Sequence, residues 1–386
     1  MSRIRMLVGL VLAVALVGAS LAEGAFAAEK KEFTIANIRW DMGDIAFNGD
    51  QHGTELEIAD IEKRDGVKIN MLTFGSNDPQ EQRKAAEAYF ARGVDGILLS
   101  AFQPSAVIPI VREANRRGIP IVTHDSAVPG QRQITVYPLA VSAGEIVGKA
   151  LLDNVEAIRG EEYLKNEGGH IVELRGIVTM GVDIQRYTGW RNSLEKFMAK
   201  YPKVTVSTHV AEFNANKARQ AADANVSRYG DKILCFFSID GTMGVAGAIP
   251  ALKSAGLFKP KDDPKHIPVG TIDGTEEEFE AARRGDLDFF IDNGKITQGR
   301  LTMRTLYEWM TLGWDKMAKP GDELWPNDDD IREPYEVVDG QTQEPAFDGY
   351  IYSFRNLCYP LDMDGQSKDG WGNAYYHAIN GKWPWE

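Results

Sequence analysis

The chain has 386 residues, of which 43% are hydrophobic and 26% are charged, a composition typical of a globular protein with room for two ordinary domains. Its formal net charge of −13 excludes nucleic acid and anionic membrane surfaces as main partners, because both require a basic face.

The first 27 residues have the pattern of a secretory signal peptide. Arg3 and Arg5 precede an apolar stretch from Met6 to Ala22, and the small-x-small sequence AFA follows at 25–27. A membrane anchor is the alternative, but this stretch is short and is interrupted by glycine and serine. We therefore expect cleavage after Ala27, export, and no direct insertion into a membrane.

Apolar runs alternate with helical patterns through the next hundred residues. The predicted strands are "FTIANIRW", "VKINMLTFG", "VDGILLSA" and "IPIVTHD", and amphipathic stretches such as "DPQEQRKAAEAYFARG" separate them. Short apolar strands with helices between them predict βαβ units, and therefore a parallel sheet with helices on both faces.

A second set of the same kind begins after "QITVYPLAVSAGE". Its strands are "GGHIVELRG", "VTVSTHVAEF", "KILCFFSID", "IPVGTID" and "LDFFIDN". The sequence thus predicts an α/β fold of two doubly wound parallel-sheet lobes joined by a hinge. We assign residues 28–139 plus 294–320 to the N-terminal lobe and 140–293 to the C-terminal lobe, with crossings near residues 139 and 293.

Residues 321–386 differ in composition from the rest of the chain. They are rich in Asp, Gly, Pro, Trp and Tyr and lack a helical period, yet they are too aromatic for a disordered tail. We expect an ordered but irregular C-terminal extension packed on one lobe. Cys235 lies in a predicted buried strand and Cys358 in this extension, so both a disulfide and a buried free thiol remain open.

Three of the predicted strands end on an acid: Asp125, Asp240 and Asp273. In an open parallel sheet, ligands bind outside the carboxyl ends of the strands, where all three acids lie. Thr275 and Glu278 form a capping box, which frees Asp273 from capping the next helix. Asp125 precedes a loop, so we expect Asp125 and Asp273 to bind ligand, whereas Asp240 is expected to cap a helix or form a turn.

Motifs of enzymatic or metal chemistry are mostly absent from the sequence. It contains no G-x-S-x-G elbow, no phosphate loop and no H-E-x-x-H, and its six histidines are scattered singly. The acidic run at 362–369 lacks the spacing of a calcium loop. We expect no catalytic residues, no cofactor and no bound metal.

The ordered set of segments resembles the periplasmic sugar-binding proteins of the ribose- and galactose-binding type, over roughly residues 33–310. The matching segments are "DIAFNGDQHGTELEIA", "IPIVTHDSAV", "IVTMGVDIQRYTGWRNSL", "VAEFNANKA" and "VGTIDGTEEEFEAARRGDLDFFIDNGKITQG". The resemblance implies a type I periplasmic binding fold. The ligand-binding residues that it implies are Phe47, Asp125, Arg186, Phe213, Asp273 and Asn293. Trp40, just before the first loop, is added because it can fill space in the cleft.

The resemblance also implies a function. A periplasmic solute-binding protein of this kind is no enzyme; as a monomer it captures a small-molecule ligand, here a sugar, cyclitol or related polyol. It then delivers that ligand to the membrane subunits of an ABC importer. Two alternatives stay open: a sensory module that presents its ligand to a chemoreceptor or kinase, and a secreted carbohydrate-active enzyme with Asp125 and Asp273 as acid and base.

Two positions depart from the family pattern. Ser126 stands where a basic residue often follows the aspartate, and Ile239 stands where a hydrogen-bonding Asn is common. A ligand hydroxyl left without a partner on binding is costly. We therefore expect a less polar cleft that binds glucose, galactose and ribose weakly.

Overall fold

The computed structural model describes residues 30–43, 45–322, 324, 336–339, 347–354, 357–359, 366 and 371–386. The expected signal peptide, residues 1–27, lies outside this part of the chain. No helix in the described part is both long enough and apolar enough to cross a bilayer.

The N-terminal lobe is built on a seven-stranded sheet in the order β11-β12-β5-β4-β3-β1-β2. Its strands are β1 (Glu32–Arg39), β2 (Lys68–Gly75), β3 (Gly96–Leu99), β4 (Ile121–His124), β5 (Gly130–Pro138), β11 (Glu336–Asp339) and β12 (Phe347–Phe354). Every pair is parallel except β11 with β12. Its helical segments are α2 (Ile45–Asp65), α3 (Pro79–Arg92), η1 (Pro104–Val107), α4 (Ile108–Arg117), α11 (Lys295–Leu312) and η4 (Trp314–Lys316).

Both faces of this sheet are buried, as the apolar strands predict. Ile35 packs in a core with residues of α2 and α11, whereas its neighbour Ala36 packs in a second core with residues of α3 and α4. Successive strand residues point to opposite faces, so an unbroken apolar run supplies both cores.

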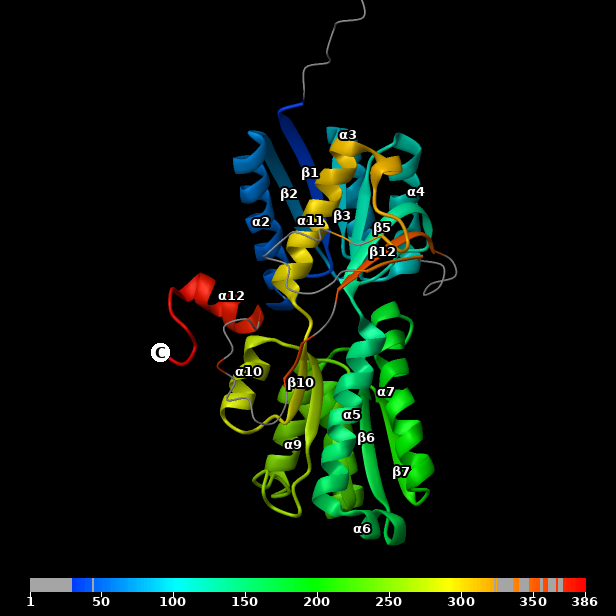
Figure 1. The fold of residues 1–386 in the computed structure, drawn as a ribbon, viewed down its shortest axis with the longest axis vertical. Helices are drawn as coiled ribbons and strands as arrows, with labels where there is room; N and C mark the ends of the chain where they lie inside the picture. Colours follow the sequence, from blue (N-terminus) through cyan, green and yellow to red (C-terminus); the bar gives the residue numbers. More distant parts are fainter. Residues whose placement is uncertain are drawn as a thin grey trace, which may run out of the picture.

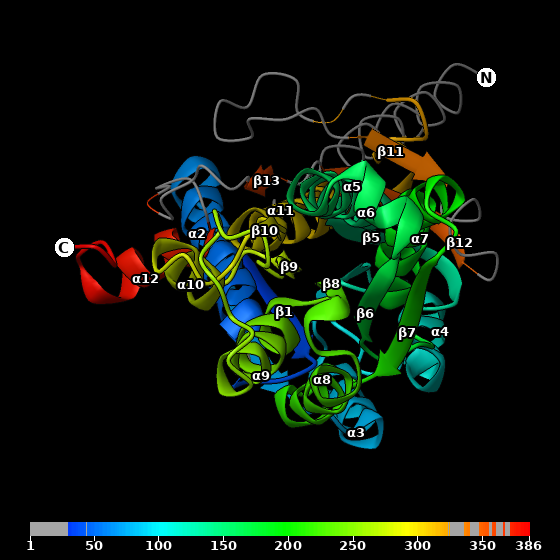
Figure 2. The ribbon, with the colours of Figure 1, turned by 90° about the horizontal axis from the view of Figure 1, so that it is seen from below.

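The C-terminal lobe has a six-stranded sheet in the order β13-β10-β9-β8-β6-β7. Its strands are β6 (Gly169–Arg175), β7 (Val204–Val210), β8 (Ile233–Ser238), β9 (Val269–Asp273), β10 (Phe289–Asp292) and β13 (Leu357–Tyr359). Its helical segments are α5 (Ala140–Arg159), α6 (Glu161–Asn166), α7 (Gly181–Lys200), α8 (Ala215–Tyr229), η2 (Gly230–Lys232), η3 (Met243–Ala248), α9 (Ile249–Ser254) and α10 (Glu276–Arg283). Helices α5 and α7 cover one face of the sheet, and α8 and α9 cover the other (Figure 2).

The chain passes between the lobes where β5 leads into α5 and where β10 leads into α11, near residues 139 and 293 (Figure 1). It passes a third time between β12 and β13, because β12 pairs with β5 in one sheet and β13 pairs with β10 in the other. The confirmed fold is thus two parallel-sheet α/β lobes joined by three connections.

The C-terminal extension differs from the expected irregular cap on one lobe. Its described parts add strands to both sheets, and helix α12 (Trp371–Asn380) lies beside α10 and α2 (Figures 1 and 2). Within β12, Tyr352 is buried and donates its hydroxyl to Ala318 O at 3.0 Å, while the Tyr350 ring stacks on Trp314. These alternating aromatic residues are a strand signal that the acidic composition of the extension obscured.

The strand order also shows whether Cys235 and Cys358 can form a disulfide. Cys235 is a buried free thiol in β8, and burial raises its pKa. Cys358 lies in β13, separated from β8 by β9 and β10. Three strand spacings amount to about 14 Å, which is far beyond the reach of a disulfide.

Candidate ligand site

On the N-terminal lobe the site is organised by Asp125, which follows β4 with a left-handed backbone (φ 63°). One carboxylate oxygen binds the ammonium group of Lys295, which also contacts Gln298 Oε1 at 3.1 Å and lies 5.6 Å from the centre of the Phe47 ring. Burial opposes ionisation, but the charge and hydrogen bond of Lys295, together with nearby His124 and Arg186, lower the pKa of Asp125. The other oxygen, Oδ2, is buried without a hydrogen-bond partner among the described residues.

On the C-terminal lobe the site is organised by an arginine–carboxylate pair. Arg186 donates through Nη2 to Asp273 Oδ1 at 2.9 Å and through Nη1 to Ile239 O at 2.8 Å. Asn293 Nδ2 donates to the same oxygen of Asp273 at 2.8 Å. The amide oxygen of Asn293 is buried and has no partner in the described part of the chain.

The position of Arg186 depends on close packing between α5 and α7. A Cβ atom on Gly144 of α5 would lie 2.0 Å from Arg186 O, and one on Gly189 of α7 would lie 1.9 Å from Val141 O. The two helices therefore touch backbone to backbone, which no larger residue at these positions allows. This contact holds α7 beside the hinge, and it therefore fixes the position of the Arg186 backbone.

Aromatic rings from both lobes meet between these polar groups. The Trp40 ring lies 5.6 Å from Phe47, 5.4 Å from Phe102 and 5.9 Å from Phe213, measured between ring centres. The first three rings belong to the N-terminal lobe and Phe213 to the C-terminal lobe. The lobes are therefore in contact in this structure, with their carboxyl edges facing each other.

The space left between the lobes beside the hinge is small. Its lining residues are Asp125, Ser126, Ala127, Pro138, Ala140, Gly181, Val182, Gln185 and Arg186. Among them remains a volume of about 10 Å³, which is room for about one water molecule. A ligand larger than water can enter here only if the lobes separate or the side chains rearrange.

The structure brings together all seven residues proposed from the sequence. The members of this group are Trp40, Phe47, Asp125, Arg186, Phe213, Asp273 and Asn293. Their contact with a ligand stays a prediction. Two neighbours were missed: Phe102, which follows the end of β3 and obeys the same strand-edge rule, and Lys295, which follows the hinge directly.

Comparison with known proteins agrees with this arrangement. A family model described as periplasmic binding protein domain matches residues 51–313. The chain belongs to this periplasmic binding protein family. Its extension, including α12, lies outside the matched segment.

Individual relatives are distant but cover most of the chain. The galactofuranose-binding protein YtfQ of Escherichia coli (strain K12) is 25% identical over 243 residues, which are 62% of this chain and 71% of that protein. The xylitol-binding protein of Mycolicibacterium smegmatis is 24% identical over 273 residues, 66% of this chain and 71% of that protein. The solved structure of a galactofuranose binding protein has a TM-score of 0.64 at 20% identity and covers 86% of this chain and 95% of its own, which shows the shared fold.

Two further expectations concern residues beside the cleft of this periplasmic binding protein. Asp240 Oδ1 accepts from Met243 N at 2.8 Å, so its helix-capping role is confirmed. Thr275 and Glu278 form the expected capping box. The side chain of Ile239 is fully buried in the hydrophobic core of the C-terminal lobe, and its carbonyl oxygen accepts from Arg186. The expected weak binding of glucose, galactose and ribose stays a prediction.

Two more buried carboxyl groups lie behind Asp273. Glu278 accepts from Thr271 Oγ1 at 2.5 Å and from Thr275 N at 2.8 Å. Burial and the charge of Asp273 raise the pKa of Glu278 to about 8. Asp292 accepts from Gly294 N at 2.6 Å, and burial raises its pKa to about 7. Burial thus favours the protonated form of both acids that lie beside the Asp273 carboxylate.

Replacing Glu278 by glutamine is expected to change how stability depends on pH. The folded protein keeps the Glu278 proton up to about pH 8, whereas an unfolded chain releases it near about pH 4.3. The unfolded state therefore binds fewer protons in this window, and the free energy of unfolding falls as pH rises through it. Glu278→Gln removes the contribution of this residue to the decrease in the free energy of unfolding. Urea denaturation at pH 5 and pH 8.5 measures the difference. Glu280→Gln, exposed on the same helix, is the control, and equal pH slopes for Glu278→Gln and wild type contradict the prediction.

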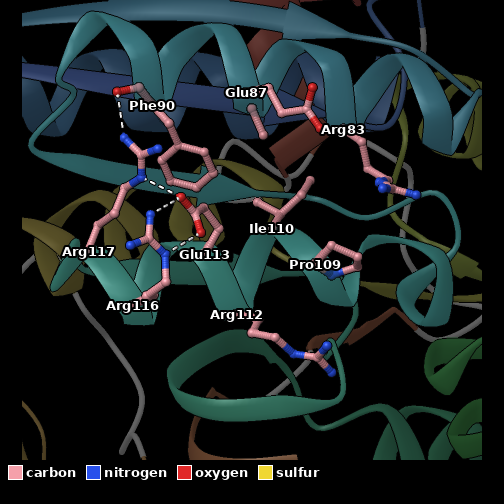
Figure 3. Close-up of a pocket in the computed structure, with 10 residues that line it drawn as sticks. Arg83, Glu87, Phe90, Pro109, Ile110, Arg112, Glu113, Arg116 and Arg117 are labelled. Atoms are coloured by element: carbon pink, nitrogen blue, oxygen red, sulfur yellow. Dashed lines mark hydrogen bonds and ion pairs between the residues drawn. The ribbon is translucent and has the colours of Figure 1, made fainter.

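A larger groove lies elsewhere, on the outer face of the N-terminal lobe between α3 and α4 (Figure 3). It measures about 460 Å³ and shares no lining residue with the space between the lobes. At one end, Glu113 binds the guanidinium groups of Arg116 and Arg117. Its walls come from one lobe, so closure of the lobes would not enclose a ligand there.

Proposed function

We propose that this periplasmic binding protein captures a small sugar or polyol between its lobes and delivers it to the membrane subunits of an ABC importer. The observation that carries the proposal is the meeting of Asp125 from one lobe with the Arg186–Asp273 pair from the other, beside aromatic rings of both. Export through the signal peptide at 1–27, and action as a monomer, are part of the proposal.

The chemistry of the site suits a polyhydroxylated ligand. Asp125 Oδ2, Asn293 Oδ1 and the Ser126 hydroxyl are buried without hydrogen-bond partners in the described part of the chain. Buried polar atoms of this kind normally find a partner, and ligand hydroxyls can supply it. The rings of Trp40 and Phe213 can cover the apolar C–H face of a sugar. Relatives named for galactofuranose and xylitol support both sugars and linear polyols as candidates.

The electrostatic surroundings of Asp125 argue against the alternative function, a secreted carbohydrate-active enzyme. Such an enzyme needs one carboxylic acid that keeps its proton near neutral pH. Lys295 lowers the pKa of Asp125, which makes this residue a poor general acid. Prolonged incubation with aryl glycosides is the test, and the proposal expects the glycosides to be recovered unchanged.

Native mass spectrometry of protein taken from its own periplasm tests the ligand class directly. The expected result is an added mass equal to a small sugar, polyol or cyclitol, followed by a thermal shift with the matching compound. The screen includes glucose, galactose and ribose, because burial of Ile239 in the core removes one of the two arguments against them. No added mass and no thermal shift with any polyol would contradict the proposal.

Ligand binding is expected to shift the protein towards the closed arrangement seen here. The described residues give three connections between the lobes, and hinge closure is the usual motion of two-lobed binders. Small-angle scattering should give a smaller radius of gyration with saturating ligand than without it. An unchanged radius would show that the protein binds without closure.

A further inference from the structure

Helix α12 is firmly attached to the C-terminal lobe. The backbone N–H of Trp371 donates to Asp292 Oδ2 at 2.9 Å, and Arg283 Nη1 donates to Asn373 Oδ1 at 3.0 Å. A Cβ atom on Gly372 would lie 2.3 Å from Glu276 N, so the start of α12 touches the start of α10 backbone to backbone. These contacts order the helix as part of that lobe.

The same helix also contacts the N-terminal lobe through aromatic rings. The Trp371 ring packs on α2 at Gly49, where an added Cβ would lie 2.6 Å from the tryptophan ring. One turn later, the Tyr375 ring lies 5.9 Å from the His52 ring of α2. Figure 1 shows α12 beside the junction of the lobes, between α2 and α10. The helix therefore joins two bodies that otherwise move about the hinge.

Trp371 also reaches the proposed ligand site. It is buried, and its indole Nε1 donates to the backbone oxygen of Asp273 at 2.6 Å. The carboxylate of the same residue accepts from Arg186 and Asn293. One side chain thus holds the backbone of Asp273 while its ring packs on the opposite lobe.

From these contacts we infer that α12 is a clasp that stabilises the closed lobes, and that Trp371 is a positioning residue for Asp273. The part concerning Asp273 rests on the proposed function; the clasp itself does not. Because α12 binds one lobe by hydrogen bonds and the other by ring packing, opening separates it from α2 and leaves it on α10. The clasp therefore slows release of a bound ligand.

A double-mutant cycle between Gly49 and Trp371 tests the inference. Gly49→Ala places a methyl group against the Trp371 ring and should raise the ligand dissociation rate about 10-fold. In a Trp371→Ala background the ring is gone, so the same substitution should have no effect, since alanine is otherwise favourable in a helix. Ile379→Ala, on the same helix with 63% of the side chain exposed, is the matched control and should leave the rate unchanged.

Two further variants keep the test decisive if Trp371→Ala does not fold. Trp371→Phe keeps a ring but loses the donor to Asp273, and should weaken affinity about 3- to 10-fold. His52→Ala removes the ring partner of Tyr375 and should raise the dissociation rate without altering Asp273. Additive effects of Gly49→Ala and Trp371→Ala, or wild-type behaviour of both Trp371→Phe and His52→Ala, would overturn the inference.

Scattering from ligand-free protein separates this inference from the proposed function. The radius of gyration of Gly49→Ala and His52→Ala should exceed that of wild type, because the open form gains population. This measurement needs no ligand, so its result remains valid even if no sugar is found to bind. An unchanged radius in both variants would refute the clasp even if the protein binds sugar.

Discussion

Arg186→Ala is expected to abolish ligand binding and to lower the free energy of unfolding by about 3–5 kcal/mol, the usual cost of removing one partner of a buried ion pair. The Arg186 side chain is only 7% exposed and serves both Asp273 Oδ1 and Ile239 O. Its loss leaves the partly buried Asp273 carboxylate without its cation and the buried Ile239 carbonyl without its donor. Calorimetry measures the affinity, and denaturant titration measures the stability.

Arg219→Ala provides the matched control for this prediction. Arg219 also belongs to the C-terminal lobe and pairs with a carboxylate, Asp223, but at the surface, where such pairs contribute little. We expect nearly wild-type stability and affinity from it. If Arg186→Ala lost stability but kept its affinity, Arg186 would be structural only, and the proposed site would need another donor.

Lys295→Met, which affects the ion pair of the N-terminal lobe, is expected to lower the free energy of unfolding by a similar amount. Asp125 then remains buried without the ammonium group that lowers its pKa, at a cost of about 3–5 kcal/mol near neutral pH. The wild-type pair contributes stability above the unfolded pKa of about 3.9, and this contribution is lost as pH falls through the lower folded value. In Lys295→Met, burial acts without the ammonium group and raises the pKa of Asp125, so the variant regains stability as pH falls towards the unfolded value of about 3.9. The penalty of Lys295→Met should therefore shrink between pH 7 and pH 4, as denaturation at both values will show.

The double variant Lys295→Met/Asp125→Asn sharpens this experiment. With both charges removed, much of the lost stability should return at pH 7, whereas the ligand affinity should not. Lys149→Met, which affects the exposed pair with Asp153, serves as the surface control. An equal penalty at pH 7 and pH 4, with no recovery in the double variant, would show that the charge of Asp125 is not the cause.

Much of the site was predictable because a parallel sheet places the carboxyl ends of its strands along one edge. Asp125 and Asp273 could be chosen from the apolar runs that precede them, and the capping box at Thr275 indicated that Asp273 does not cap the next helix. The expectation for Ile239 came from the family resemblance instead, and a position in a family pattern does not say whether a side chain points into the core or the cleft.

The remaining parts depend on tertiary contacts that no local pattern records. Lys295 meets Asp125 only because the chain returns to the N-terminal lobe after residue 293. Trp371 reaches Asp273 across 98 positions of sequence. In the extension, turn-forming and acidic residues dominate the composition, and this concealed both the strand around Tyr352 and the short helix α12.

The pairing of β12 with β5 and of β13 with β10 has a consequence for biosynthesis. A ribosome makes the first strands of the N-terminal lobe early, yet residues 347–359, which supply strands to both sheets, are made only after all the strands with which they pair. Until then, each sheet presents an open edge, which is a template for unwanted pairing between chains. Both sheets therefore keep an uncovered edge until residues 347–359 have been made, although β5 and β10, which form those edges, precede this segment by more than 50 residues.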